Sequence, residues 1–363
     1  MPFDSRIDKL PALLLAFAFV AAWPALSHAQ TPDQHVGQSV PRDVREMYDR
    51  GLQFLASTQT PEGTWNDSQQ GAAVTGLAVM SFLASGEDPN FGIYSSHVKK
   101  ALRSIISGQD AQTGYLGNSM YHHGFGMLAL AESYGAVDDR TLWTTGDDKT
   151  RRGPQGQAAQ QRSIGQALEL AVRCAVTSQK KNNFGGWRYM PNSTDADTSV
   201  SGAVLVGLLA ARNAGVEVPD ECIDKAISFY QSMTSPSGQV AYTGGLGGFD
   251  ESIARISIGC LVYSLAHRKD LPQYKSTLAY LTQRLEQPPN NAYPEYTRYY
   301  EAQALFQGDV DAWEKWNRLL VRELKQQQQS DGGFNSQYGR SIGTSMALLS
   351  LALNYRFLPI YER

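Results

Sequence analysis

The chain of 363 residues has little cysteine and little charge. Cys174, Cys222 and Cys260 are few and odd in number, so we expect buried free thiols and at most one bridge rather than a disulfide scaffold. Charged side chains make up 18% of the chain, below the ~25% of typical soluble domains. With a formal net charge of −3 and no polybasic block, the sequence indicates no nucleic-acid partner and no anionic membrane surface.

Long apolar runs are also missing, apart from a short one at the N-terminus. It begins after Arg6 and Lys9 and ends at Ser27-His28-Ala29, where small residues occupy the −3 and −1 positions of a cleavage site. This order is typical of a secretory signal peptide. An uncleaved anchor helix is the alternative, although two prolines and ~12 central residues suit a membrane span poorly. We therefore predict a signal peptide at 1–29, a polar linker at 30–42 and an exported mature protein.

A repeated unit is the main feature of the remaining sequence. Gln59 to Trp65 reads QTPEGTW and Gln328 to Phe334 reads QQSDGGF, so both fit Gln, three residues, Gly, one residue and an aromatic ring. Anchoring glutamines recur along the chain at Gln59, Gln109, Gln179, Gln231, Gln287 and Gln328. Repetition on this scale predicts a stack of similar supersecondary units.

Each unit is expected to contain two helices of different character. The first is amphipathic, with apolar stripes such as Val44, Tyr48, Leu52 and Leu55. The second is small or apolar on nearly every face, as in residues 72–84, 199–211 and 341–353. Because a helix that is apolar all round is a buried helix, we predict six outer and six inner helices. The predicted fold is an all-α (α/α)6 toroid over residues 43–363, with an open solenoid as the alternative.

One insertion interrupts the helical pattern at 136–162. Its stretch TTGDDKTRRGPQGQAAQQ is polar, contains Gly and Pro, and has few apolar residues. Such a composition is typical of a mobile loop. The sequence leaves open whether this segment is a lid over the ring or is simply disordered.

On these features the chain resembles the prenyltransferase and squalene-oxidase repeat superfamily, which includes squalene–hopene and oxidosqualene cyclases. The two Gln-x3-Gly-x-aromatic turns carry the resemblance, together with FGGWRY at 184–189 and DADTSVSGAVLVGLLAARNAG at 195–215. MYHHGFGMLALAESYG at 120–135 and the closing NYRFLPIYER are similar to exported bacterial members with a single toroid. The resemblance covers nearly all of the mature chain.

The resemblance implies a catalytic acid. The cyclases carry Asp-x-Asp-Asp at the mouth of an inner helix, and the middle Asp protonates an alkene. The matching residues here imply Asp197 as the donor and Asp195 as its support, with Thr198 replacing the third acid. A donor must be held neutral by its neighbours. The alternative is that these carboxylates cap a helix, where the dipole lowers their pKa.

A histidine partner and a metal are the next candidates. The family pattern favours His123 as a base or donor beside the acid, and a structural histidine is the alternative. Zinc prenyltransferases in the superfamily use an Asp, a Cys and a His, but the nearest match, Asp220-Glu221-Cys222, opens an amphipathic helix. Ligands so scattered predict no metal site and no cofactor. The Cys-Gly-Glu-Gln motif of thioester proteins does not occur in the sequence.

Further residues are expected at the ring's centre. Aromatic faces there would hold an isoprenoid and stabilise carbocations, with turn packing as the alternative, and the aromatic candidates are Tyr121, Trp187, Tyr189, Tyr242, Tyr299, Tyr300 and Tyr338. Glu251 and Arg255 are four residues apart and are expected to pair. With Asp250 and Glu301 they form a polar surface that would also suit a glycan hydrolase or lyase.

The sequence thus predicts an exported terpene cyclase-like protein whose central apolar cavity binds or acid-cyclises an isoprenoid lipid. A non-catalytic binding or scaffold toroid is the first alternative, because a fold does not confer a function. A glycan hydrolase or lyase is the second. Since squalene cyclases pair two toroids and this chain has one, a long ligand would need the insertion, a partner protein or a second toroid to enclose it.

Overall fold

The computed structural model describes residues 40–68, 70–143, 161–244, 251–286 and 293–361, all within the compact unit Val40–Arg363. The predicted signal peptide, most of the linker and residues 144–160 of the insertion lie outside this part. The outer helices are α1 (Arg42–Thr58), α3 (Ser95–Gly108), α5 (Ile164–Gln179), α7 (Asp220–Met233), α9 (Pro272–Thr282) and α11 (Val310–Gln327). The inner helices are α2 (Ala72–Leu83), α4 (Met120–Ser133), α6 (Thr198–Asn213), α8 (Ile253–Leu265), α10 (Pro294–Gly308) and α12 (Arg340–Leu351).

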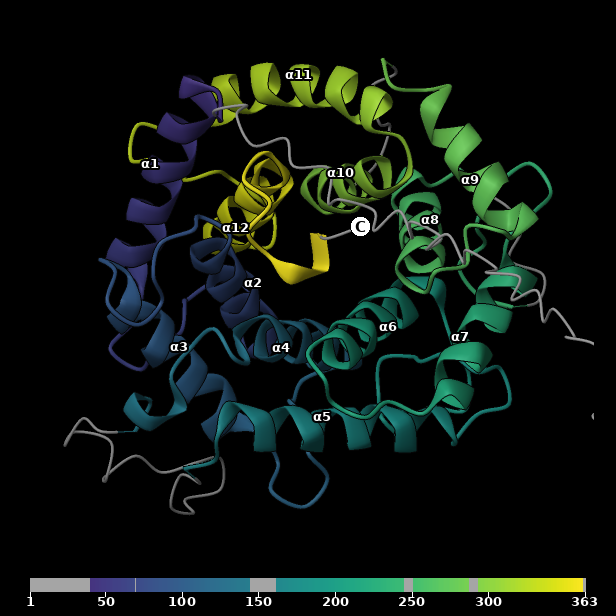
Figure 1. The fold of residues 1–363 in the computed structure, drawn as a ribbon, viewed down its shortest axis with the longest axis horizontal. Helices are drawn as coiled ribbons and strands as arrows, with labels where there is room; N and C mark the ends of the chain where they lie inside the picture. The colour runs from purple at the N-terminus through teal and green to yellow at the C-terminus, as the bar shows by residue number, and fades with distance from the viewer. Residues whose placement is uncertain (1–39, 69, 144–160, 245–250, 287–292, 362–363) are drawn as a thin grey trace, which may run out of the picture. The chain divides into compact units, whose positions relative to one another are not determined.

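These helices form a closed double ring (Figure 1). Each inner helix packs against the next one, and α12 packs against α2, so the last unit meets the first. The outer helices surround this inner ring, and each packs mainly against the inner helix that precedes it, as α3 does against α2 and α1 against α12. The described residues contain no β-strand beyond isolated bridges. The predicted all-α (α/α)6 toroid is confirmed, and the open-solenoid alternative is wrong because the ends of the repeat meet.

The two predicted helix types differ in how much of their surface is buried. In α6 every residue from Val200 to Ala211 is buried, whereas α1 buries one stripe and exposes the rest. Glycines let the inner helices approach closely. A Cβ on Gly124 of α4 would lie 2.6 Å from the carbonyl oxygen of Ala203, and one on Gly207 of α6 would lie 2.8 Å from that of Gly124. Small residues therefore set the narrow spacing between α4 and α6.

Four of the predicted anchoring glutamines join neighbouring outer helices, whereas Gln231 lies within α7 and does not show this pair of bonds. Gln179 donates from Nε2 to the carbonyl of Gly185 in its own turn at 2.6 Å and to that of Cys222 in α7 at 2.9 Å. Gln59, Gln109 and Gln328 make the same pair of bonds in their own units. In the last unit Gln328 reaches Met47 of α1 at 2.8 Å. The repeated glutamine therefore also closes the ring, while Gln287 lies outside the described residues.

The C-terminal segment covers one end of the ring. After α12 it forms two 3-10 turns, η4 (Ala352–Asn354) and η5 (Pro359–Tyr361), and its side chains from Leu358 to Tyr361 are largely buried. In Figure 1 this yellow segment passes over the centre of the inner ring. The N–H of Ile360 donates to Oε2 of Glu132 at 3.3 Å, and Glu132 is in the last turn of α4. The covered end is therefore the one where the inner helices terminate.

Two smaller expectations concern cysteine and membrane spans. Cys174, Cys222 and Cys260 are buried free thiols, as predicted. None of the helices in the described ranges combines the length and apolar character needed to cross a bilayer.

Candidate functional site

The candidate acid lies at the other end of the ring, where the inner helices begin. Asp197 is the N-cap residue of α6, and its Oδ1 accepts the N–H of Val200 at 2.8 Å. The residue is 0% exposed. Its second oxygen, Oδ2, is buried and has no hydrogen-bond partner among the described residues. One oxygen therefore caps the helix, and the other is buried without a hydrogen-bond partner in the described part of the chain.

Burial raises the pKa of Asp197 to about 6, although the bond from Val200 and the charge of Arg188 act in the opposite direction. The expectation that a capping Asp197 would have a lowered pKa is therefore wrong. The residue does cap the helix, but the loss of hydration outweighs the capping bond. The carboxyl therefore keeps its proton to a higher pH than an ordinary Asp does, which is the direction that a proton donor requires.

The other two positions of the acid motif have different roles. Asp195 is exposed, and its Oδ2 lies 3.4 Å from Nε of Arg188. Its charge also raises the pKa of Asp197, as the smallest of the contributing effects. Thr198 is buried, donates from Oγ1 to the carbonyl of Ala241 at 2.8 Å, and so fastens the start of α6. Asp195 therefore supports Asp197 through its charge, without a direct bond.

Tyrosines surround the acid. The hydroxyls of Tyr189 and Tyr242 lie 2.8 Å apart, and those of Tyr121 and Tyr296 lie 3.2 Å apart. Burial is the main cause that raises the pKa values of Tyr121 and Tyr242, and the negative charge of Asp197 raises both further, so their hydroxyls lie within its electrostatic reach. The structure thus brings three predicted cavity residues, Tyr121, Tyr189 and Tyr242, to the predicted acid.

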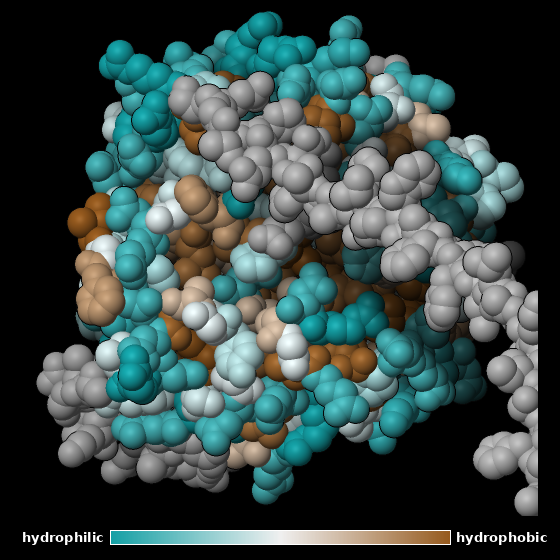
Figure 2. Space-filling view, in the orientation of Figure 1, coloured by the Kyte–Doolittle hydropathy of each residue, from teal (hydrophilic) through white to brown (hydrophobic). Residues whose placement is uncertain are grey.

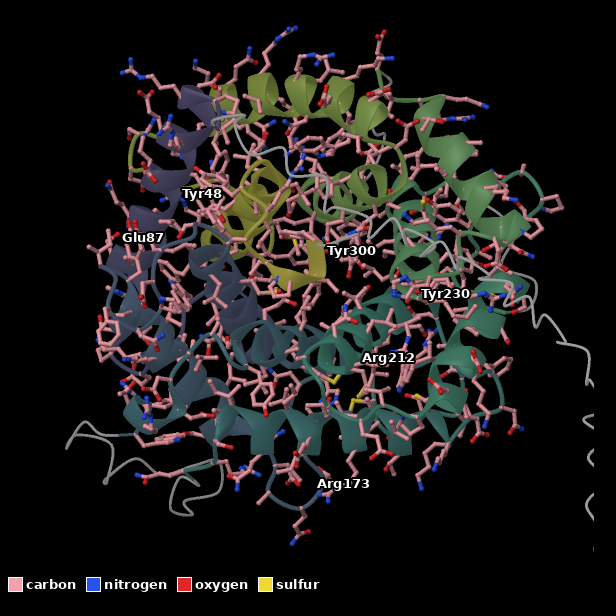
Figure 3. The ribbon with its side chains drawn as sticks, viewed as in Figure 1. Tyr48, Glu87, Arg173, Arg212, Tyr230 and Tyr300 are labelled. Carbon is pink, nitrogen blue, oxygen red and sulfur yellow. The ribbon has the colours of Figure 1, made fainter. Side chains whose placement is uncertain are left out.

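Several residues of this cluster were not among those predicted from the sequence. Tyr230 reaches from α7 and donates its hydroxyl to the carbonyl of Thr198 (Figure 3). Tyr296 and Tyr300 lie one helical turn apart on α10, with ring centroids 4.9 Å apart, so the spacing in PEYTRYY could have found them as a pair. Arg188 lies inside the FGGWRY motif, between the predicted cavity residues Trp187 and Tyr189. Glu295, also near this end, accepts a hydrogen bond from Ser336.

The remaining predicted aromatic residues are mainly packing elements. Trp187 is buried and donates from Nε1 to the carbonyl of Ala175 at 2.8 Å, and Trp65 makes the matching bond to Leu55 at 2.9 Å. This is the turn packing given as the alternative role. Tyr299 and Tyr300 are buried on α10, and Figure 3 shows Tyr300 toward the centre of the ring. Tyr338 stacks on Tyr293 beside the mouth, with centroids 5.9 Å apart.

His123 is not brought to Asp197. It is fully buried between α4 and α5, where Nδ1 accepts the N–H of Leu116 at 3.2 Å and Nε2 lies 3.0 Å from the carbonyl oxygen of Ala171. Burial lowers the pKa of His123 to about 4, so the ring is neutral at physiological pH. Its two nitrogens serve backbone groups, as expected of the structural histidine named as the alternative.

The residues predicted to form one polar surface at the ring's centre have separate partners in the structure. Glu251 accepts from Tyr280 of α9 at 2.7 Å and lies 3.3 Å from Nε of Arg284, just after the end of α9, so Arg255 is not its partner. Arg255 donates from Nε to the carbonyl of Val240 at 2.9 Å. Glu301 is buried, and its pKa is raised to about 7 by burial despite a hydrogen bond with Trp316 of α11. Asp250 lies outside the described residues. Glu251 and Glu301 therefore do not share one surface.

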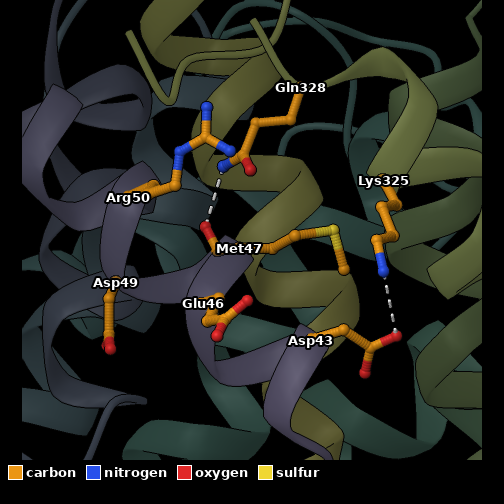
Figure 4. Close-up of a pocket in the computed structure, with 7 residues that line it drawn as sticks. All are labelled: Asp43, Glu46, Met47, Asp49, Arg50, Lys325 and Gln328. Atoms are coloured by element: carbon orange, nitrogen blue, oxygen red, sulfur yellow. Dashed lines mark hydrogen bonds and ion pairs between the residues drawn. The ribbon is translucent and has the colours of Figure 1, made fainter. Parts of the chain in front are cut away.

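Two hollows on the outside of the ring lie where neighbouring units meet. One of about 330 Å³ lies between α1 and α11 and is lined by Asp43, Glu46, Met47, Asp49, Arg50, Lys325 and Gln328 (Figure 4). The other, of about 680 Å³, lies beside Gln179 and α7. Each adjoins an anchoring glutamine, so both result from the way neighbouring units meet. Within the described ranges no group of His, Cys, Asp or Glu is arranged to hold a metal.

The face drawn in Figure 2 shows the distribution of hydropathy. Apolar side chains, in brown, show at the centre of the ring, while hydrophilic residues, in teal, cover its periphery. Buried apolar residues of the inner helices continue as one cluster through the molecule. The centre of the toroid is therefore apolar, and the polar atoms of Asp197 and Arg188 at its mouth are exceptions.

Comparison with known proteins gives structural matches only. No protein-family model matches the chain, and no curated protein matches it by sequence. One similar solved structure is a variant of type II terpene cyclase MstE from Scytonema in complex with geranylgeranyl dihydroxybenzoate, at 13% identity and a TM-score of 0.58, over 87% of this chain and 98% of that one. Another is the GH76A alpha-1,6-mannanase from Salegentibacter sp. HEL1_6, at 12% identity and a TM-score of 0.58, over 85% and 98% of the two chains.

An alpha-amylase from Clostridium perfringens is similar to the same degree, at 11% identity and a TM-score of 0.58, over 86% of this chain and 99% of that one. Terpene cyclases and glycan-acting enzymes thus share this architecture. At such low identity the likeness shows the fold alone, and the chemistry must be argued from the site. By its structure, this chain is an α/α toroid with terpene cyclase-like and glycosidase-like neighbours.

Proposed function

We propose that this protein binds an isoprenoid-like apolar ligand in the ring and that Asp197 is the acid that protonates it, as in a type II terpene cyclase. One observation carries the proposal: a fully buried carboxyl with one oxygen bound and the other unpartnered among the described residues. Its raised pKa favours the protonated form. The tyrosine rings beside it can stabilise a developing carbocation through cation–π attraction.

The ends of the ring differ in a way that suits this use. The C-terminal segment covers the end where the inner helices terminate, while Asp197 and Tyr121 lie at the end where they begin. An apolar chain would therefore enter beside the acid and extend toward Tyr300 and the covered end. The MstE structure, which contains a geranylgeranyl compound, supports this class of ligand.

The main alternative is a non-catalytic binding toroid. It shares the apolar centre but needs no proton donor, and the replacement of the third motif acid by Thr198 favours it. A glycan hydrolase receives less support, because Glu251 and Glu301 contact the outer helices α9 and α11. Export of the mature protein remains a prediction from residues 1–29, to be tested by mass spectrometry of its N-terminus.

The test compares wild type with Asp197→Asn. Asn retains the size and the capping ability of Asp, so the fold should survive. We first expect mass spectrometry of an organic extract of the purified protein to show a bound isoprenoid. Incubation with linear polyprenyl substrates should then give a cyclised product, and the variant should lose at least about 100-fold in rate, the scale of general-acid catalysis. Product formation that is equal in both proteins would refute the role of Asp197.

Binding without turnover in wild type would favour the non-catalytic toroid. Asp195→Asn is a useful comparison, because Asp195 is exposed and acts on Asp197 only through its charge. We expect it to lower the rate far less than Asp197→Asn does. An equal loss in both variants would instead indicate that the two carboxyls work as one unit.

A further inference from the structure

Arg188 has a donor that its surroundings do not use. Its Nε lies 3.4 Å from Oδ2 of Asp195, but Nη1 is buried and has no hydrogen-bond partner in the described part of the chain. The guanidinium lies over the rings of Tyr189 and Tyr242, with its central carbon 5.6 and 5.5 Å from their centroids. A buried, charged N–H without an acceptor is costly, so this donor is expected to bind an acceptor that the chain does not supply.

This arrangement differs from that of the other arginines with a buried nitrogen lacking a partner. In those residues the atom concerned is Nε, which lies within the side chain, and they include Arg162, Arg298 and Arg340. In Arg188 it is a terminal nitrogen, the part of the guanidinium that binds carboxylates and phosphates. Among these arginines, the unused donor of Arg188 is thus the one best suited to bind an anionic ligand.

A second unused group belongs to the same cluster. Oδ2 of Asp197 is buried and unpartnered within the described ranges, and the charge of Arg188 acts on this carboxyl, yet the two side chains form no ion pair. Tyr242 is close enough to both for their charges to act on its hydroxyl. A buried donor and a buried acceptor therefore lie near one group of tyrosines without satisfying each other.

We propose that Arg188 is the head-group site of the ligand and binds an anionic oxygen group, such as a carboxylate, at the end of an otherwise apolar molecule. This proposal rests on the proposed function and specifies its ligand as an amphiphile. Binding would also affect catalysis. Because the positive charge of Arg188 lowers the pKa of Asp197, an anion that offsets this charge would favour the protonated acid. The ligand would thus help to prepare its own proton donor.

The test uses a matched pair of probes, geranylgeranoic acid and geranylgeraniol, titrated into the full mature chain by calorimetry. Wild type should bind the acid at least about tenfold more tightly than the alcohol, the scale of a charged hydrogen bond. Arg188→Gln should abolish this preference and leave alcohol affinity within about threefold. Arg188→Lys, which retains the charge but not the planar fork, should restore part of it. Titration of geranylgeranyl phosphate in the same way, compared with geranylgeranoic acid, shows whether the site prefers a phosphate or a carboxylate.

The control is Arg284→Gln. Arg284 also lies over a tyrosine, 3.8 Å from the centroid of Tyr280, and is paired with Glu251, but it lies just after the end of α9. The Arg284→Gln variant should retain the full preference for geranylgeranoic acid over geranylgeraniol. Equal binding of acid and alcohol by wild type would overturn the head-group site and leave the apolar site intact. The same conclusion follows if folded Arg188→Gln retains the preference. Failure of wild type to bind either probe would overturn the apolar ligand site itself.

Discussion

At the residue scale, Asp197 combines two roles that the sequence presents as alternatives. Its position before a run of small apolar residues predicts a helix cap, and the bond from Val200 confirms it. The motif match to the cyclases predicts an acid. Burial allows both, because the oxygen that does not cap the helix has lost its water. Complete burial of a polar loop residue depends on distant neighbours such as Tyr121 and Tyr242, and local sequence does not reveal it.

This burial has a measurable cost in stability. The pKa of Asp197 is about 6 in the folded protein, against ~3.9 for a free Asp side chain. The folded state therefore holds a proton that the unfolded state loses as pH rises, so stability decreases between about pH 4 and pH 6 and remains lower above it. Two pKa units correspond to about 3 kcal/mol, an upper bound for this residue.

We expect Asp197→Asn to remove this dependence. From pH 4 to pH 7.5 wild type should lose stability relative to the variant. The difference in unfolding free energy, variant minus wild type, should therefore increase by up to about 3 kcal/mol over this range. Urea denaturation of both proteins across this range measures the difference, and other titrating groups such as Glu301 cancel because both proteins contain them. A difference that does not change with pH would show that Asp197 has an ordinary pKa.

At the scale of the element, the turns decide how the units meet. The sequence shows that Gln and Gly recur, but their purpose lies in contacts with the next outer helix. Gly332 adopts a φ of +91°, and a Cβ there would overlap the backbone carbonyl of Arg50 in α1. Gly63, Gly114, Gly185 and Gly238 show the same combination of positive φ and close contact in other units. The glycine is therefore required by the neighbouring helix as well as by its own turn.

Gly332→Ala and Gly117→Ala separate these two requirements. Gly117 also has a positive φ, of 74°, but a Cβ there would meet nothing within 4 Å. We expect Gly117→Ala to cost about 1–2 kcal/mol of unfolding free energy, the strain of a left-handed residue. Gly332→Ala should cost at least about 2 kcal/mol more, because it forces α1 and α11 apart at the seam that closes the ring. Equal losses in thermal or urea denaturation would contradict the role of this contact.

At the scale of the whole molecule, the ring has two unlike ends. Residues near the C-terminus connect helices far apart in sequence: Tyr355 packs on Tyr48 of α1, Arg356 lies over Phe306 of α10, and Ile360 bonds to Glu132 of α4. The sequence distinguishes NYRFLPIYER only by its resemblance to single-toroid bacterial proteins. Its buried apolar side chains instead form the cover of one end of the toroid.

Single substitutions in this segment test its contribution. Ile360 is 4% exposed, so Ile360→Ala should lower the free energy of unfolding by about 2–4 kcal/mol, as for other buried aliphatic truncations. Phe357 is 56% exposed, and Phe357→Ala should cost less than about 1 kcal/mol although it removes the larger side chain. Both are measured by urea denaturation. If the exposed substitution were as costly as the buried one, the segment would not act as a buried cover.

The sequence by itself determined the repeat, the two helix types and the toroid, because 3.6-residue periodicity and all-round apolar helices depend only on neighbours along the chain. It also named Asp197, Tyr121, Tyr189 and Tyr242 as candidates for the ring's centre, within a larger set that the structure divides. Only the tertiary structure decided which way side chains face. It turned His123 and Glu301 toward outer helices, gave Glu251 a partner on α9, and left Arg188 and Asp197 with unused atoms at the same mouth. Burial and pairing arise between helices distant in sequence, and no local pattern encodes them.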